Sequence, residues 1–300
     1  MWPISKHSKG AETIGLYAAR DEAVAIHAAP SSAGLSVLTD VFHLGQQEQP
    51  LKELISRAHL RGRQVNGVLS MSEYQLLMVD APDVPAEELR SAVKWKIRDL
   101  INFHIDDVVI DVFDVPTRET VSSVRSLYVV AARVDAVQNL VDRLFVAGLE
   151  IGAIDIVEMA LRNLAHAAAG EREGLVTLYL EPNRGVIVFS RGGMLHFTRQ
   201  LDLGFSQLDD PEVNSRLVLE IQRSLDYCDS HLGFGRPSRI TVVPFQDAKP
   251  AFVEGISTAI GLPSGFFELS QFVDIPAFEG ITAPDWIALG GALRVEERKL

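Results

Sequence analysis

The sequence contains a single cysteine, Cys228, among its 300 residues. An internal disulfide bond is therefore excluded, and such low cysteine content is typical of a reducing compartment. No stretch of about eighteen apolar residues is present, so we expect no transmembrane helix. The opening residues also lack the apolar core of a signal peptide. These absences predict a cytosolic chain, or one that reaches a membrane only through a partner.

Basic residues are scarce as well: 28 Lys and Arg stand against 40 Asp and Glu, which gives a net charge of −12. Nucleic-acid binding requires a basic face, so neither DNA nor RNA is expected as the main partner. The eight His residues show no metal-ligand spacing, and no Walker-type, His-Glu-x-x-His or Gly-x-Ser-x-Gly motif is present. We therefore predict no catalytic residue and no metal ligand. Cys228 lies on the apolar side of a helical pattern and is predicted to belong to the core.

What the chain does contain is enough apolar sequence, 47% of its residues, for two well-packed domains. Three short strands separated by turn signals are predicted in a row, followed by a helix at 212–232; the strands are 175–180, 186–190 and 195–201. A weaker copy of this pattern opens the chain. It consists of strands at 13–19, 22–29 and 35–43 and a helical stretch from Leu51. The repetition predicts an α/β protein with two similar halves.

A smaller unit is predicted inside the first half. Residues 85–155 read as helix, strand, strand, helix and strand, with Asp83 as the helix cap and Pro85 in its first turn. The preceding stretch, 74–79, is apolar almost throughout, as expected of a central strand covered on both faces. The predicted organisation is a disordered N-terminus at 1–12, a first half at 13–170, a second half at 175–294 and a charged tail at 295–300.

Three stretches carry a resemblance to a known family. They are YQLLMVDAPDVPAEELRSAVKWKIRDLINFHIDDVVIDVF at 74–113, RLVLEIQRSLDY at 216–227 and WIALGGALR at 286–294. Together they resemble the PilM/MshI proteins of type IV pilus assembly, which have the actin-like ATPase fold. The resemblance implies two ribonuclease-H-like halves, with a small α/β subdomain inserted in the first half at the position of the predicted insert.

Proteins of this fold hold ATP between two hairpins and a glycine-rich loop. Glycine lets backbone N–H groups approach the phosphates, and an Asp in each hairpin binds Mg²⁺ directly or through water. In this chain the Asp and Gly places of the first hairpin are taken by Tyr17 and Ala19. Those of the second hairpin are taken by Tyr179 and Glu181.

Two prolines add to these departures. Pro182 removes an N–H donor from the second hairpin, and Pro244 stands in the loop where a triple glycine is usual. Bulky rings and a carboxylate would fill the place of a triphosphate and repel it. The residues therefore predict a degenerate nucleotide site that binds neither ATP nor Mg²⁺, in a protein that is not an enzyme.

One exposed aromatic residue is predicted to bind a partner. The apolar stripe of the helix after Pro85 comprises Leu89, Val93, Ile97, Leu100 and Ile101. Trp95 lies off this stripe, between basic residues that include Lys94 and Arg98, where it could anchor a peptide. The alternative is that Trp95 packs under the turn at 101–107.

The resemblance implies a cytoplasmic scaffold of the inner-membrane platform of a type IV, MSHA-like pilus. Its partner would be a PilN/MshJ-like bitopic membrane protein, bound through that protein's N-terminal cytoplasmic peptide, together with other platform or motor components. The scaffold would not insert into the membrane itself. Two alternatives remain open. One is an ATP-binding actin-like ATPase whose nucleotide state gates partner binding, and the other is a small-molecule kinase of the same fold superfamily.

Overall fold

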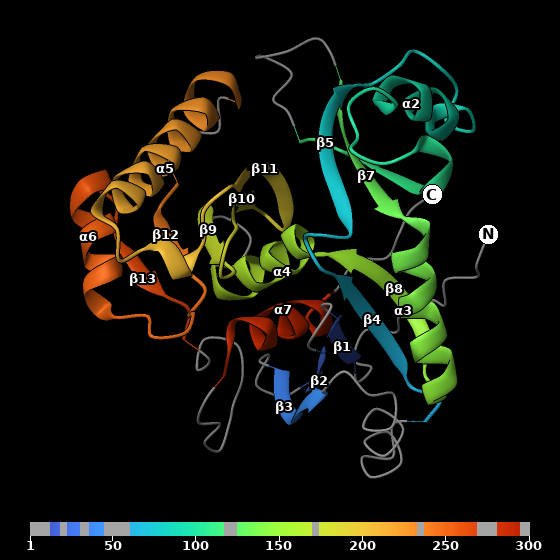
Figure 1. The fold of residues 1–300 in the computed structure, drawn as a ribbon, viewed down its shortest axis with the longest axis horizontal. Helices are drawn as coiled ribbons and strands as arrows, with labels where there is room; N and C mark the ends of the chain where they lie inside the picture. Colours follow the sequence, from blue (N-terminus) through green and yellow to red (C-terminus); the bar gives the residue numbers. More distant parts are fainter. Residues whose placement is uncertain are drawn as a thin grey trace.

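The computed structural model describes residues 13–18, 23–30, 36–44, 61–116, 125–169, 174–232, 237–268 and 281–294. The predicted helix from Leu51, the N-terminus at 1–12 and the tail at 295–300 lie outside these ranges. Two five-stranded sheets form the framework (Figure 1). The first has the order β3 (Ser36–Leu44), β2 (Ala23–Pro30), β1 (Thr13–Ala18), β4 (Gln64–Leu69) and β8 (Glu150–Ile156). The second has the order β11 (Met194–Leu201), β10 (Gly185–Arg191), β9 (Leu175–Leu180), β12 (Arg239–Val242) and β13 (Ser264–Phe266).

The two sheets share one topology. In each, the first three strands along the chain pair antiparallel as a meander. The fourth strand pairs in parallel with the first strand of the meander, and the fifth pairs in parallel with the fourth. The meanders arise because short Val-, Ile- and Leu-rich runs are separated by turn residues, such as Pro182 to Arg184 between β9 and β10. The predicted pair of similar α/β halves is confirmed.

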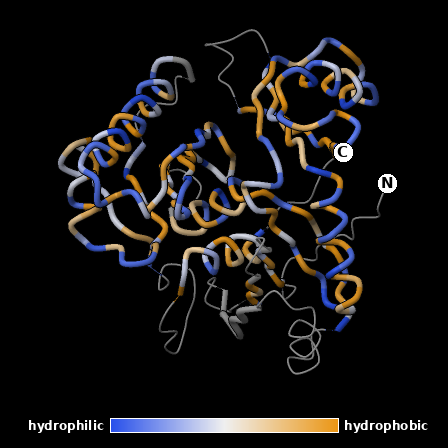
Figure 2. The backbone as a smooth tube through the Cα atoms, in the orientation of Figure 1, coloured by the Kyte–Doolittle hydropathy of each residue, from blue (hydrophilic) through white to orange (hydrophobic). Residues whose placement is uncertain are grey.

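Helices cover both sheets. Between the sheets lie α4 (Val157–Ala169) and α7 (Ala283–Ala292), with α7 against the first sheet and α4 against the second. The outer face of the first sheet is covered by α3 (Val134–Ala147), and that of the second by α5 (Pro211–Leu232) and α6 (Pro250–Ile260). Figure 2 shows hydrophilic and hydrophobic segments alternating along α3, α5 and α6, as expected of helices with one buried face. Cys228 lies on the buried face of α5, in the core as predicted, and burial raises its pKa to about 12.

Helix α7 packs on the first sheet. The predicted second half at 175–294 included this helix, so the prediction differs from the structure at this helix. Its last carbonyl groups have no partner within the helix, and side chains of the first half bond them. Asn163 Nδ2 donates to Gly290 O at 2.8 Å, Asn66 Nδ2 to Gly291 O at 3.0 Å and Thr13 Oγ1 to Ala292 O at 2.6 Å. The buried end of α7 is thus fixed to β1, β4 and α4.

A third, smaller sheet lies beside the first. It has the antiparallel order β5 (Tyr74–Asp80), β7 (Ser126–Arg133) and β6 (Val108–Asp114). Helix α2 (Leu89–Ile97) covers one face, and two short 3-10 helices occur elsewhere, at Ile105–Asp107 and Phe205–Gln207. The predicted insert at 85–155 differs from the small sheet in two strands. Strand β5, which precedes residue 85, is part of the small sheet, and β8, which the prediction included, belongs to the first large sheet.

Three local predictions in this region are wrong. The first is that β5 is a central strand; it is an edge strand, and it is apolar because Leu77 and Val79 face α2 while Tyr74 packs on the main core. The second is the Asp83 cap, because α2 begins only at Leu89, after a turn at 86–88, and its cap position is Glu88. The third is the burial of Leu100, which is 55% exposed because the helix ends at Ile97.

Candidate functional site

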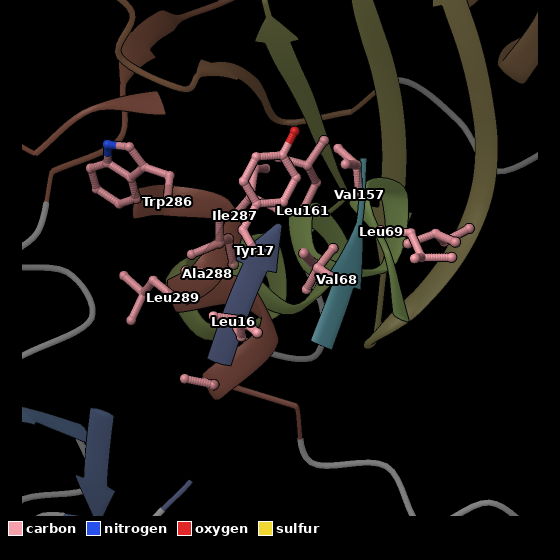
Figure 3. Packing of buried hydrophobic residues seen from close by; sticks show 14 of the residues in the cluster. Leu16, Tyr17, Val68, Leu69, Val157, Leu161, Trp286, Ile287, Ala288 and Leu289 are labelled. Carbon is pink, nitrogen blue, oxygen red and sulfur yellow. The ribbon is translucent and has the colours of Figure 1, made fainter. Parts of the chain in front are cut away.

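The two hairpins that would hold a nucleotide meet through equivalent tyrosines. Strands β1 (TIGLYA) and β9 (LVTLYL) carry Tyr17 and Tyr179 at the same position, and each tyrosine pairs with a valine of the next strand. Both side chains are buried. Figure 3 shows the ring of Tyr17 beside Ile287 of α7 and Leu161 of α4, with its hydroxyl directed away from β1. The equivalent strand ends of the two halves are therefore occupied by phenol rings.

A hydrogen bond joins the halves at this point. The Tyr17 hydroxyl donates to Glu181 Oε1 at 3.0 Å, across the boundary between the first and second sheets. Burial raises the pKa of Tyr17 well above its ordinary value, and the neighbouring Tyr179 and Glu181 add to the effect. Burial also raises the pKa of Glu181, against the opposing effects of the Tyr17 bond and of Arg184, whose Nε lies 3.5 Å from Glu181 Oε2. We call Tyr17, Tyr179 and Glu181 the seam.

The turn after Glu181 is held by its own backbone. Glu181 N donates to Arg184 O at 2.8 Å, and the carbonyls of Glu181 and Pro182 accept from Phe205 N and Ser206 N. Gly204 lies so close to this turn that a Cβ there would come within 2.4 Å of the Pro182 carbonyl. The turn is therefore closed by packing and backbone bonds, and its carbonyls are directed to residues 205 and 206.

The loop that carries Pro244 is occupied by aromatic side chains. Phe245 stacks on Phe205 with ring centres 5.6 Å apart and meets Phe252 edge-on at 5.3 Å. Pro244 itself is half-buried next to this cluster. Of the six positions predicted to have lost nucleotide chemistry, the structure brings Tyr17, Tyr179 and Glu181 together. Ala19 lies outside the described residues.

A pocket of about 350 Å³ opens beside the second hairpin. Its lining comprises Met71, Asn183, Arg184, Gly185, Gln200, Leu201 and Asp202. The volume is near the lower end of the range for small-molecule sites, roughly 300–1,000 Å³. One cation and one carboxylate face it together with two amides. This is a mixed polar surface, unlike a cradle of glycine N–H groups around phosphate.

The predicted partner site lies on the outer surface of α2. Trp95 is 74% exposed, so the alternative in which it packs under the turn at 101–107 is wrong. The basic side chains next to Trp95 form ion pairs. Lys94 Nζ is 3.6 Å from Asp106 Oδ1, and Arg98 Nε is 3.3 Å from Asp99 Oδ1. Exposed pairs of this kind contribute little to stability and exchange readily with other partners. The surface therefore presents one indole ring among replaceable ion pairs.

Two further buried polar links escaped the sequence analysis. The Tyr74 hydroxyl donates to Glu158 Oε2 at 2.5 Å, and the Tyr128 hydroxyl donates to His196 O at 3.2 Å. No motif marks either pair, because the partners are far apart in sequence. The available signal was Glu158 itself, an acidic residue near the start of a helix whose other residues are mostly apolar and buried. No group of three or more His, Cys, Asp or Glu in the described part of the chain could hold a metal ion.

The buried carboxyl group of Glu158 should make the stability of the folded protein depend on pH. Burial raises its pKa above the ordinary 4.5, so folding favours the protonated form. The contribution of this carboxyl group to the free energy of unfolding is complete below its ordinary pKa, and it is lost as pH rises through the pKa of the folded state. We expect Glu158→Gln, which keeps the shape, to gain stability relative to the wild type as pH rises from about 5 to about 8, measured by urea unfolding. Glu254→Gln, on an exposed carboxylate of α6, is the matched control. A pH-independent difference for Glu158→Gln would refute the prediction.

Solved structures of other proteins resemble the whole chain in fold, although sequence comparison finds no match. No protein-family model matches the chain, and no curated protein sequence matches it. A solved chain of the PilM-PilN type IV pilus biogenesis complex matches it with a TM-score of 0.71 at 20% identity, over 94% of this chain and 98% of that one. The cytoplasmic domain of EpsL, an inner membrane component of the type II secretion system of Vibrio cholerae, matches with a TM-score of 0.56 at 14% identity, over 96% and 97%.

A third solved structure describes the fold in words. It is a Bacteroides thetaiotaomicron protein with an actin-like ATPase fold and unknown function, with a TM-score of 0.52 at 8% identity, over 88% of this chain and 92% of that one. The chain therefore has the actin-like ATPase fold, as the sequence predicted. None of the helices in the described ranges has both the length and the apolarity to cross a bilayer.

Proposed function

We propose that this chain is a non-catalytic platform protein of a type IV pilus, which binds the cytoplasmic tail of a PilN-like membrane protein. Two observations support the proposal. The fold resembles that of a chain in the PilM-PilN complex over 94% of its length. The stretches at 74–113, 216–227 and 286–294 resemble the PilM/MshI proteins, which favours an MSHA-like system and an MshJ-like partner.

The observation that carries the non-catalytic part is the seam. A triphosphate between the hairpins would have to displace the Tyr17–Glu181 hydrogen bond and two buried phenol rings. It would also approach the carboxyl group of Glu181, where a phosphate site normally offers N–H donors or cations. The aromatic cluster around Phe245 occupies the loop expected to receive the base. Each of these features disfavours ATP, and together they support a degenerate nucleotide site.

The binding part of the proposal rests on α2. A Trp that is 74% exposed, on a rigid helix with a buried opposite face, is the kind of residue that dominates peptide interfaces. The tail of a bitopic protein would place its aliphatic side chains against Trp95 and its acidic groups near Lys94 and Arg98. Attachment to the inner membrane would come from the partner, which would make this chain a cytoplasmic, peripheral component that also contacts other platform or motor proteins.

A binding titration tests this function directly. The ligand is a fluorescently labelled peptide with the sequence of the N-terminal cytoplasmic tail of a PilN-like protein from the same genome, and the readout is fluorescence anisotropy. We expect saturable binding in the micromolar range, about −8 kcal/mol, typical of a short ordered segment. A scrambled peptide of the same composition should not bind. Equal binding of both peptides, or of neither, would contradict the proposed function.

A further inference from the structure

The pocket of about 350 Å³ beside the second hairpin is bordered by both halves of the chain. Met71, in the turn between β4 and β5, belongs to the first half, and residues 183–185 and 200–202 belong to the second. None of the three seam residues is part of the lining. A ligand in this pocket would therefore contact both halves without displacing the Tyr17–Glu181 hydrogen bond.

Hydrogen bonds fix the walls of the pocket. On the side of the first half, Glu73 N donates to Ser70 O at 3.0 Å, and Ser70 N donates to Glu73 Oε2 at 2.8 Å. These bonds close the turn that carries the buried Met71. On the other side, Gly185 of β10 pairs with Leu201 of β11. The pocket is thus formed before any ligand binds, as is usual for small-molecule sites.

Two opposite charges line this pocket without forming an ion pair with each other, those of Arg184 and Asp202. Arg184 Nε lies 3.5 Å from Glu181 Oε2, and its two Nη groups have no partner among the described residues. Over the same ranges of the chain, the carboxylate of Asp202 has neither a hydrogen bond nor an ion pair. The pocket therefore holds a cation and an anion apart, each with unused bonding capacity.

This arrangement selects the charge of a ligand. The end of a guanidinium group binds a carboxylate through two parallel hydrogen bonds, and a carboxylate accepts hydrogen bonds from an ammonium group. A ligand that is only an anion would be repelled by Asp202, and one that is only a cation would be repelled by Arg184. A small molecule that carries both charges satisfies both residues, and the volume is near the lower end for small-molecule sites.

We propose that the pocket binds a free amino acid, whose carboxylate pairs with Arg184 and whose ammonium group pairs with Asp202. The remaining polar lining consists of the amides of Asn183 and Gln200, and Gln200 also hydrogen-bonds Glu158. These amides favour an amino acid with an uncharged polar side chain. The site goes beyond the proposed function and does not depend on it.

A ligand-observed NMR titration of the full chain tests this site with L-glutamine and two analogues that each lack one charge. Glutaramic acid lacks the ammonium group, and γ-aminobutyramide lacks the carboxylate. We expect saturable binding of glutamine with a Kd of about 1 mM or tighter. Each analogue should bind about tenfold more weakly or worse, because that factor corresponds to one hydrogen bond with a charged group.

Two variants assign the charges to residues. Asp202→Asn should weaken binding of glutamine about tenfold and leave that of glutaramic acid unchanged, since glutaramic acid has no ammonium group. Arg184→Gln should weaken binding of glutamine and leave that of γ-aminobutyramide unchanged. Asp209→Asn is the matched control, because Asp209 is an exposed carboxylate of the second half outside the lining. It should bind glutamine as tightly as the unaltered chain.

Three results would overturn the proposal. They are the absence of saturable glutamine binding, equal affinity for glutamine and both analogues, and an unchanged affinity of Asp202→Asn for glutamine. Asp202 is exposed and makes no contact that folding needs, so its variant should fold like the unaltered chain. No tail peptide is present in the titration, so its outcome is independent of the proposed pilus function.

Discussion

Replacement of Gly15 by alanine is expected to destabilise the protein by about 3 kcal/mol or more, or to prevent folding. Gly15 lies in β1, directly against α7. An added Cβ would be 1.9 Å from Ala288 O and 2.4 Å from Ala292 N. Both atoms are backbone, so no side-chain rotation can relieve the contact. Overpacking a core costs typically about 1–3 kcal/mol, and a backbone clash belongs at or above the upper end.

The loss should be visible as a lower urea midpoint with an unchanged slope, since the whole core unfolds with α7. Gly255 in α6 provides the control, because a Cβ added there meets nothing within 4 Å. Gly255→Ala should be neutral or stabilise by about 0.5–1 kcal/mol, since alanine is the better helix former. Equal stability of the Gly15 and Gly255 variants would mean that α7 does not pack on β1 as described.

Replacement of Trp95 by alanine should weaken binding of the PilN-like tail about thirtyfold or more. A buried aromatic anchor in a peptide interface contributes about 2–4 kcal/mol on truncation, and each 1.4 kcal/mol is a factor of ten. The stability of the free protein should hardly change, because the indole is 74% exposed. The measurement is the anisotropy titration with the labelled tail, alongside a urea melt of the same variant.

Phe145 is a matched control for this substitution. It is also an exposed aromatic residue on a helix, 78% exposed on α3, but it lies outside the α2 surface. Phe145→Ala should leave the affinity for the tail unchanged. If Trp95→Ala binds as tightly as the wild type, Trp95 is not the anchor. If the Phe145 variant loses affinity instead, the tail binds on α3.

The sequence predicted the strands of both halves because apolar runs and turn residues are local signals. Strand β9 was predicted with its exact bounds, and α5 begins one residue before its predicted start. The return of α7 to the first sheet was not predicted, because it depends on close contact between Gly15 and α7 and on side chains such as Asn163, which no local pattern reveals. Strand β5 was predicted at the centre of a sheet because its apolar sequence does not reveal that its two faces pack on different cores.

The seam was predicted only in part. Resemblance to the actin-like pattern singled out Tyr17, Tyr179 and Glu181 as residues in place of Asp and Gly. Their hydrogen bond could not be predicted, because the two residues that it joins are 164 positions apart and meet only when the two sheets are placed together. From the sequence, Glu181 was interpreted as a negative charge that would repel phosphate. In the structure Glu181 also accepts the hydrogen bond from Tyr17, which links the first half of the chain to the second. Positions were therefore predictable, and contacts were not.

The central claim is that the seam occupies the place of a nucleotide, and calorimetry with ATP and Mg²⁺ tests it most directly. A site with a Kd of about 10 μM would stabilise the folded protein by about 2.7 kcal/mol at about 1 mM ligand. We expect neither binding heat nor a shift of the melting temperature under those conditions. Saturable binding of ATP with a matching thermal shift would contradict the claim, and would mean that the Tyr17–Glu181 hydrogen bond opens to admit the nucleotide.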